Sequence, residues 1–423
     1  MIGDVDVAVV GAGVAGLAAA ARLRRAGRSC ALIEASGRIG GRAFTDCPAA
    51  LGGAWFDHGA TWLHDAEHNP LTAIARAAGE VLIDSDAVRR WRVQIGARVA
   101  TAAEMALYRA AWAAFATMVR GRAETAADIS FAEAMAPLRG NPWAATIELW
   151  EAAQIAAADP ARLSLRDWRD NDLSGSNLIV EGGIGAFVAR RLGAMAGAVA
   201  LDTPALGVAW GDGVRVATAR GTIRARAAIV TVSTGVLADG IRFDPALPDA
   251  TQAAIAALPM GLLTKIALPA RGADRLGMAE TMSVRRQVVA GEASLSFTFW
   301  PFGRPYVQSF LGGPAAWALS RAGAAATEDF AREQLRVLLG ATADRCLGPA
   351  VVTGWGEDEW HHGSYAYATV GNAGARAVLG TPIADGRLVF AGEAACIDGL
   401  AGTVGGAYRS GARAAETVMA ALG

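Results

Sequence analysis

The sequence predicts an α/β fold, α+β over the whole chain, in which one lobe is assembled from separated segments. A strand, a glycine-rich turn, a helix and a second strand follow one another in residues 5–34. Short apolar strand patterns return over residues 198–245, and strand, turn and helix return in the last forty residues. Alternation of strand and helix is typical of a parallel sheet covered by helices. We therefore expect a discontinuous nucleotide-binding lobe of Rossmann type with a second lobe, of mixed β-sheet and helices, inserted in pieces.

The expected boundaries follow these changes of pattern. The first lobe is expected to comprise residues 1–85, 198–255 and 380–423, and the second lobe residues 86–197 and 256–379.

The first element is a dinucleotide-binding fingerprint in its full context. Val5–Val10 reads as a buried parallel strand, the turn Gly11-Ala12-Gly13-Val14-Ala15-Gly16 follows at once, and residues 17–26 read as a helix. Residues 28–33 form the next strand, with Glu34 at its end. In this motif the glycines permit a tight turn, close approach to a pyrophosphate and close helix packing, and the acid binds a ribose. The free N–H groups at the helix N-terminus favour phosphate.

A second glycine turn follows the ribose acid. It reads Ala35-Ser36-Gly37-Arg38-Ile39-Gly40-Gly41-Arg42. Arginine suits a diphosphate because its guanidinium is planar and always charged. This addition distinguishes a site for FAD from a simple NAD fingerprint.

The middle of the chain supplies the second lobe. Residues 100–160 are Ala-rich with a helical pattern, and their large apolar side chains are expected in the core: Trp112, Phe115, Met118, Trp143 and Trp150. Strands are expected over residues 262–268 and 293–302 of this lobe, and over residues 208–210, 213–217 and 227–232 of the first lobe.

The last forty residues complete the nucleotide lobe. Residues 387–391 read as a strand that ends in Gly392-Glu393. The segment from Gly402 to Gly411 then opens a helix of residues 405–422. A helix N-terminus built from small residues can approach a flavin ring and direct its positive dipole at developing negative charge.

Composition excludes several other classes. The 423 residues carry a formal net charge of −1, so no basic field exists to bind nucleic acid or an anionic membrane. The four cysteines and five histidines show no metal-ligand spacing, and we expect no metal site. The apolar run of residues 7–21 lacks a basic flank and is too short to span a bilayer. We expect a cytoplasmic protein; the oligomeric state stays open.

Lys265 is the only lysine beside 38 arginines, and it lies in the apolar strand pattern Leu262–Leu268. A charged side chain in such a strand costs free energy unless it serves a function or lies at the exposed edge of a sheet. A buried ammonium can shift its pKa by several units and hold a single water, which arginine cannot do.

Taken together, the motifs resemble flavin-dependent amine oxidases over nearly the whole chain. The segment Gly59-Ala60-Thr61-Trp62-Leu63-His64 resembles polyamine and spermine oxidases in particular. The resemblance implies that Lys265 is catalytic, holding a water against flavin N5. It also implies that Ser364 replaces the cysteine that binds FAD covalently in monoamine oxidases, so FAD is expected to be non-covalent. The residues expected to contact FAD are Gly11, Gly13, Val14, Ala15, Gly16, Glu34, Ala35, Gly40, Gly41, Arg42, Gly59, Ala60, Thr61, Trp62, Ala205, Val232, Trp355, Gly392, Glu393, Thr403, Val404 and Ala407.

The resemblance also implies a substrate site. Tyr365 would form one wall of an aromatic cage over the flavin, and Thr403 stands where monoamine oxidases have the second tyrosine. The residues expected to contact substrate are His64, Asp172, Trp355, Tyr365 and Thr403, with Asp172 binding a remote ammonium group.

The expected reaction is oxidation of a small-molecule amine, with a di- or polyamine favoured, to an imine by hydride transfer to flavin N5. Hydrolysis then gives an aldehyde or ketone, and O₂ or another acceptor takes the electrons. Two alternatives stay open. One is an L-amino-acid oxidase or another monoamine oxidase on the same fold. The other is a non-oxidative flavoprotein, either an isomerase or a silent scaffold.

Overall fold

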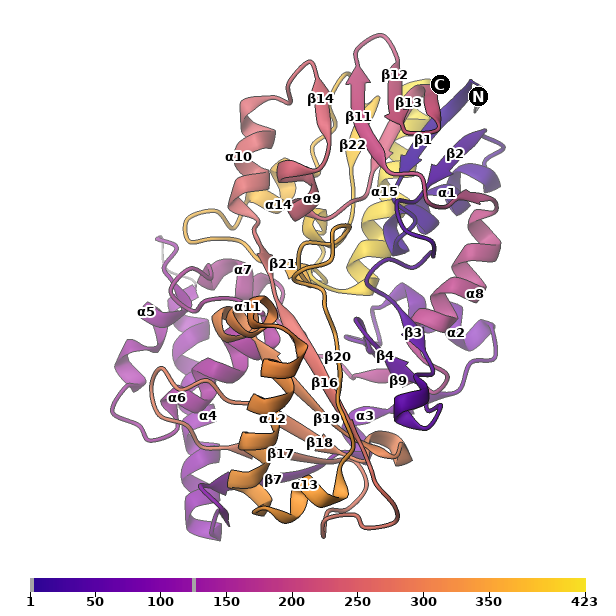
Figure 1. The fold of residues 1–423 in the computed structure, drawn as a ribbon. Coiled ribbons are helices and arrows are strands. Elements are labelled where there is room, and N and C mark those ends of the chain that lie inside the picture. The colour runs from indigo at the N-terminus through magenta and orange to yellow at the C-terminus, as the bar shows by residue number, and fades with distance from the viewer. Residues whose placement is uncertain (1–3, 124–126) are drawn as a thin grey trace.

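The computed structural model describes residues 4–123 and 127–423 and shows two lobes, each built on its own large sheet (Figure 1). Residues 1–3 and 124–126, at the start of the first expected lobe and inside the second, lie outside the described residues. The first sheet has the strand order β10-β2-β1-β13-β12-β11-β14, and β22 also pairs with β13. Its strands are β1 (Val5–Val10), β2 (Cys30–Ile33), β10 (Val199–Ala200), β11 (Ala205–Trp210), β12 (Val214–Thr218), β13 (Gly221–Val230), β14 (Arg242–Asp244) and β22 (Leu388–Phe390).

The first sheet is parallel where the nucleotide fingerprint lies. β1 runs parallel to both β2 and β13, and β13 runs parallel to β22. The inner strands are apolar and buried on both faces, as expected of a parallel sheet covered by helices. One face packs on the helices α1 (Val14–Arg25), α2 (Pro70–Ala77), α8 (Ile184–Ala196) and α15 (Val404–Leu422). The other packs on α9 (Thr234–Asp239), α10 (Asp249–Ala257) and α14 (Ala375–Leu379).

The second sheet has the order β20-β16-β19-β18-β17-β7-β8 and is mostly antiparallel. Its strands are β7 (Arg90–Ile95), β8 (Arg98–Val99), β16 (Leu263–Pro269), β17 (Met282–Arg286), β18 (Ser296–Phe299), β19 (Tyr306–Gly312) and β20 (Val351–Val352). Helices α11 (Gly313–Ala322), α12 (Ala324–Leu339) and α13 (Thr342–Cys346) pack on it.

A separate helical cluster stands beside the second sheet (Figure 1). It comprises α4 (Ala102–Ala123), α5 (Phe131–Met135), α6 (Ala144–Glu148) and α7 (Leu165–Asp170). Between α6 and α7 lies a π-helix, Leu149–Ile155, which we call the π-segment.

The structure also contains three small sheets. They pair β3 (Thr45–Asp46) with β4 (Phe56–Asp57), β15 (Met260–Gly261) with β21 (Tyr365–Ala366), and β5 (Trp62–Leu63) with β9 (Leu178–Val180) and β6 (Leu82–Asp84).

The expected α/β class is confirmed, and local details differ. The strand expected over residues 293–302 spans only β18, because Trp300 and Phe302 adopt positive φ angles of 49° and 55° and turn the chain. The lobe boundaries stay a prediction. Each large sheet takes all of its strands from one expected lobe, whereas α8, expected in the second lobe, packs in the core of the first through Phe187, Val188 and Leu192.

Candidate active site

A cavity of about 580 Å³ extends from the fingerprint turn to the π-segment. All of the residues expected to contact cofactor or substrate line it except Gly16. Gly16 instead packs inside the fingerprint, where a Cβ atom would lie 1.8 Å from the Gly11 carbonyl oxygen. This is the close helix–strand contact that the motif requires.

The N-terminus of α1 is open toward the cavity. Gly13 occupies the N-cap position and offers no side-chain hydrogen bond to the first turn. Gly11 has a φ of 96°, so this position needs a glycine to make the turn. The first-turn residues Val14 and Ala15 line the cavity. These free N–H groups fit a diphosphate.

Glu34 is buried at the end of β2 and closes the fingerprint loop. Its Oε2 accepts a hydrogen bond from the Ala12 N–H at 2.7 Å. Its Oε1 accepts from the Ser36 N–H and hydroxyl at 3.0 and 2.9 Å. A carboxylate has about four acceptor positions, so one is left for a ribose hydroxyl.

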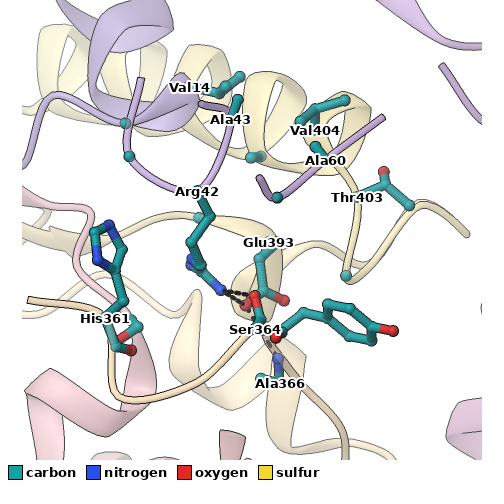
Figure 2. A pocket seen from close by; sticks show the side chains of 18 of the residues that line it. Val14, Arg42, Ala43, Ala60, His361, Ser364, Ala366, Glu393, Thr403 and Val404 are labelled. Atoms are coloured by element: carbon teal, nitrogen blue, oxygen red, sulfur yellow. Dashed lines mark hydrogen bonds and ion pairs between the residues drawn. The ribbon is translucent and has the colours of Figure 1, made fainter. Parts of the chain in front are cut away.

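The second glycine turn meets the C-terminal motif across the cavity. Figure 2 shows Arg42 and Glu393 pointing toward each other, with Arg42 Nη1 2.9 Å from Glu393 Oε1 and 2.8 Å from the Ser364 carbonyl oxygen. Glu393 Oε2 is buried and has no hydrogen-bond partner among the described residues. A donor hydroxyl on a bound cofactor would satisfy this acceptor. The open helix end, Glu34 and this unpaired oxygen together fit FAD.

Lys265 is buried on β16 and reaches the segment Asp57–Thr61. Its ammonium donates to the carbonyl oxygens of Asp57 and Gly59, at 2.7 and 2.5 Å, and to Thr61 Oγ1 at 2.5 Å. Burial lowers the pKa of Lys265 to about 8, although the nearby Asp57 carboxylate opposes this shift. All three N–H donors are therefore committed to protein acceptors, and Lys265 would have to release one of them to hold a water.

Trp355 and Tyr365 form aromatic walls of the cavity. Trp355 Nε1 donates to the His58 carbonyl oxygen at 2.9 Å, and its ring lies against Gly59. The Tyr365 hydroxyl donates to the Ile155 carbonyl oxygen at 2.7 Å, which ties the wall to the π-segment. Burial raises the pKa of Tyr365, so this hydroxyl remains a proton donor.

Thr403 contributes a small surface to the cavity because its hydroxyl caps α15. The hydroxyl donates to the Leu400 carbonyl oxygen at 2.7 Å and accepts from the Gly406 N–H at 3.1 Å. Beside it, Gly402 lies over the Tyr365 ring. A Cβ atom added at Gly402 would lie 3.6 Å from Tyr365 Cδ2, which is an ordinary van der Waals distance. The second cage wall is thus backbone and threonine, which leaves space beside Tyr365.

His64 is held in one orientation by a short chain of hydrogen bonds. His64 Nδ1 lies 2.6 Å from Asn177 Oδ1, and Asn177 Nδ2 donates to Asp86 Oδ2 at 2.9 Å. The amide oxygen can only accept, so Nδ1 carries the proton. Burial lowers the pKa of His64 and keeps it neutral, which leaves Nε2 as an acceptor.

Several residues on the cavity wall were not expected from the sequence. Trp150, expected in the core with Phe115 and Trp143, instead lines the cavity together with its neighbour Glu151. Arg89 also lines the cavity, as does the buried ion pair of Asp167 with Arg376, at 2.6 Å. Asp172 lines the cavity but is exposed. No single sequence period marks these residues, because short elements from separate parts of the chain carry them: the π-segment, α7 and α14, with Arg89 just before β7.

The described residues hold neither a cluster of metal ligands nor a membrane-spanning helix. Among residues 4–123 and 127–423 no three His, Cys, Asp or Glu side chains lie together as a metal site would require. No helix in the described part of the chain is long and apolar enough to cross a membrane.

The fold and the cavity define an α/β protein with a site for an extended dinucleotide. The family model described as "Flavin containing amine oxidoreductase" matches residues 14–419, and the chain belongs to this family. FAD is accordingly its cofactor.

Curated relatives and solved structures agree with this assignment. Polyamine oxidase 3 of Oryza sativa subsp. japonica is 30% identical, over 96% of this chain and 88% of the relative. Lysine-specific histone demethylase 1 homolog 1 of the same organism is 28% identical over 98% of this chain, which spans about half (52%) of that relative. A putrescine oxidase bound to putrescine superposes with a TM-score of 0.82 at 21% identity, over 99% of each chain. The cyclohexylamine oxidase of Brevibacterium oxydans IH-35A gives the same values.

Ser364 leads to a prediction about how FAD is held. Its hydroxyl accepts from the Leu263 N–H at 2.9 Å and donates to the Leu263 carbonyl oxygen at 3.1 Å, and it offers no thiol for a flavin bond. Acid or heat denaturation should therefore release all of the yellow flavin into the supernatant. Flavin absorbance that stays with the precipitated polypeptide would contradict non-covalent binding.

Proposed function

We propose that this protein oxidises an amine group of a small di- or polyamine to an imine, which water hydrolyses to an aldehyde or ketone. When bound, FAD would supply the redox chemistry: it would be the acceptor for a hydride from the carbon next to nitrogen, and O₂ or another acceptor would remove the electrons. The observation that carries the proposal is a single cavity that joins the fingerprint turn to Lys265, Tyr365 and the acidic π-segment.

The chain's own residues prepare the amine for this reaction. Trp355 and Tyr365 exclude water from the reacting end, and an apolar surface favours the neutral form of an amine because burial disfavours charge. Lys265 fixes the carbonyls of Asp57 and Gly59 and so holds the segment Gly59–Trp62 along the cavity. Positioning of this kind can lower a barrier by several kcal/mol, roughly 7–11 in the best-oriented cases.

The proposed preference for a polyamine rests on the carboxylates that line the cavity and on the similarity to a polyamine oxidase. The relative named polyamine oxidase covers nearly the whole chain. The space beside Tyr365 and Thr403 suits an extended alkyl chain, and carboxylates at positions 151 and 172 line the cavity. We also propose that the enzyme is cytoplasmic, because its net charge of −1 gives no attraction to an anionic membrane and its apolar run of residues 7–21 is too short to span a bilayer.

One observation favours a second candidate, an L-amino-acid oxidase. The Arg89 guanidinium lies 5.8 Å from the Trp62 ring centroid and 5.5 Å from that of Trp91. Among the described residues it makes no hydrogen bond or ion pair. A guanidinium with free donors could bind a carboxylate. The experiment that separates the candidates presents L-amino acids, monoamines and diamines to the holoenzyme without oxygen and records which of them bleaches the flavin.

A further inference from the structure

The π-segment is locked in place as a wall of the cavity. The Ala156 N–H donates to the Glu151 carbonyl oxygen at 3.0 Å, five residues back, which is the bond that defines a π-helix. Gln154 Nε2 donates to the Ser294 carbonyl oxygen at 3.0 Å. On β19, Gly312 approaches so closely that a Cβ atom would lie 1.8 Å from the Ala153 carbonyl oxygen. The side chains of the π-segment are therefore held in fixed positions.

Glu151 lies about one turn of the π-segment before the residue that accepts the hydrogen bond from Tyr365. The Tyr365 hydroxyl is bonded to the carbonyl oxygen of Ile155, and Glu151 precedes Ile155 by four residues. Because a π-helix closes hydrogen bonds between residues five apart, residues 151 and 155 lie about one turn apart. Glu151 and Tyr365 thus line the same cavity and are linked through one turn of the π-segment.

The surroundings of Glu151 leave its charge without an ion-pair partner. Burial raises the pKa of Glu151 to about 7; Arg285 and a hydrogen bond with Trp168 oppose this shift, and the nearby Asp172 carboxylate adds to it. The Arg285 guanidinium lies 3.6 Å from the Trp150 ring centroid and donates to the Tyr108 hydroxyl at 2.5 Å, while its buried Nε has no hydrogen-bond partner among the described residues. Among the described residues no cation lies within 4 Å of the Glu151 carboxylate. A half-buried carboxylate that faces the cavity without an ion-pair partner gains from a cation supplied by a ligand.

We propose that Glu151 binds the remote ammonium group of the substrate, so that the cavity selects an alkyl diamine over a monoamine of equal length. This rests on the proposed amine oxidation and names the residue that sets its substrate class. Asp172 is exposed at the same cavity and would contribute little, because water screens an ion pair there.

The test compares three amines on the FAD-loaded enzyme: butane-1,4-diamine, butan-1-amine and 4-aminobutan-1-ol. The alcohol matches the diamine in length and can donate a hydrogen bond, but it has no remote charge. The variants are Glu151→Gln, which keeps the shape and removes the charge, Asp172→Asn, and Glu148→Gln. Glu148 is the matched control because it precedes the π-segment on the same helical run and does not line the cavity. Flavin absorbance and the melting temperature of each variant report folding.

We expect the wild type to prefer the diamine over both other amines, chiefly through KM. Glu151→Gln should lower this preference at least about tenfold, because it removes one partner of an enclosed charge pair. Asp172→Asn should lower it less than about fivefold. Glu148→Gln should leave it at the wild-type value.

Three results would overturn the assignment: equal losses for diamine and monoamine in Glu151→Gln, a larger loss in Asp172→Asn, or an amino alcohol as good as the diamine. In each case amine oxidation itself would still stand. If the wild type oxidised no amine at all, the proposed function would fail and this inference with it.

Discussion

Lys265→Met is expected to leave FAD bound and to slow turnover by about 10²-fold or more, most clearly in the oxidative half-reaction. The side chain is buried and its ammonium is the common donor to Asp57, Gly59 and Thr61. Methionine fills a similar volume but donates nothing, so three buried acceptors lose their partner and the segment along the cavity loses its support. Loss of a positioned donor or proton-transfer group typically costs about 10²–10⁴ in rate.

The measurement is stopped-flow absorbance of the two half-reactions, first anaerobic reduction by amine and then mixing with oxygen. Flavin content and melting temperature of the variant establish that it is folded and loaded. Thr61→Val is the companion variant: it removes one acceptor and frees one N–H of Lys265, so it should perturb the same half-reaction less. Wild-type rates in both half-reactions of Lys265→Met would show that Lys265 is structural only.

Gly16→Ala is expected to abolish FAD binding and to destabilise the fold by about 3 kcal/mol or more. The added Cβ would lie 1.8 Å from the Gly11 carbonyl oxygen and 3.0 Å from Thr231 Oγ1, so α1 would have to move away from β1. Helix propensity acts in the opposite direction, because alanine stabilises a helix interior by about 1 kcal/mol relative to glycine. The steric cost is larger than this gain, so we expect Gly16→Ala to lower the free energy of unfolding.

Gly121→Ala is the matched control for Gly16→Ala. Gly121 also lies inside a helix, α4, and no described atom lies within 4 Å of the position that its added Cβ would take. This substitution should raise the melting temperature slightly and leave the flavin content unchanged. Thermal denaturation and the ratio of flavin to protein absorbance measure both variants. A Gly16→Ala protein that retains stoichiometric FAD would refute the role given to the fingerprint turn.

The sequence was sufficient for features that depend on neighbours along the chain. The fingerprint from Val5 to Glu34 is local, since its glycines, helix and acid are fixed by spacing, and the structure places them as expected around one turn. The partners of Lys265 could not be derived in this way. They lie about 200 residues earlier in the sequence, and only the arrangement of β16 beside residues 57–61 brings them together.

The π-segment could not be predicted from the sequence, for a different reason. An α-helix and a π-helix have similar composition, and the π-segment is in close contact with Gly312 and Gly313 of another part of the chain, which its local sequence does not reveal. The expectation that Trp150 is a core residue was wrong because the π-helix turns it toward the cavity. Asp172, expected from its place near a motif, does line the cavity, and its role in binding an ammonium stays a prediction; its greater exposure is the reason that we propose Glu151 for that role.

Above all, this chain should behave as an FAD enzyme that takes a hydride from an amine. The sharpest check is anaerobic titration of the purified holoenzyme with butane-1,4-diamine, butan-1-amine, benzylamine and a set of L-amino acids, recorded as flavin absorbance. We expect complete bleaching by the diamine at lower concentration than by either monoamine, and full return of the absorbance on admission of an electron acceptor. Flavin that stays oxidised with every amine, or that is bleached by L-amino acids alone, would contradict amine oxidation.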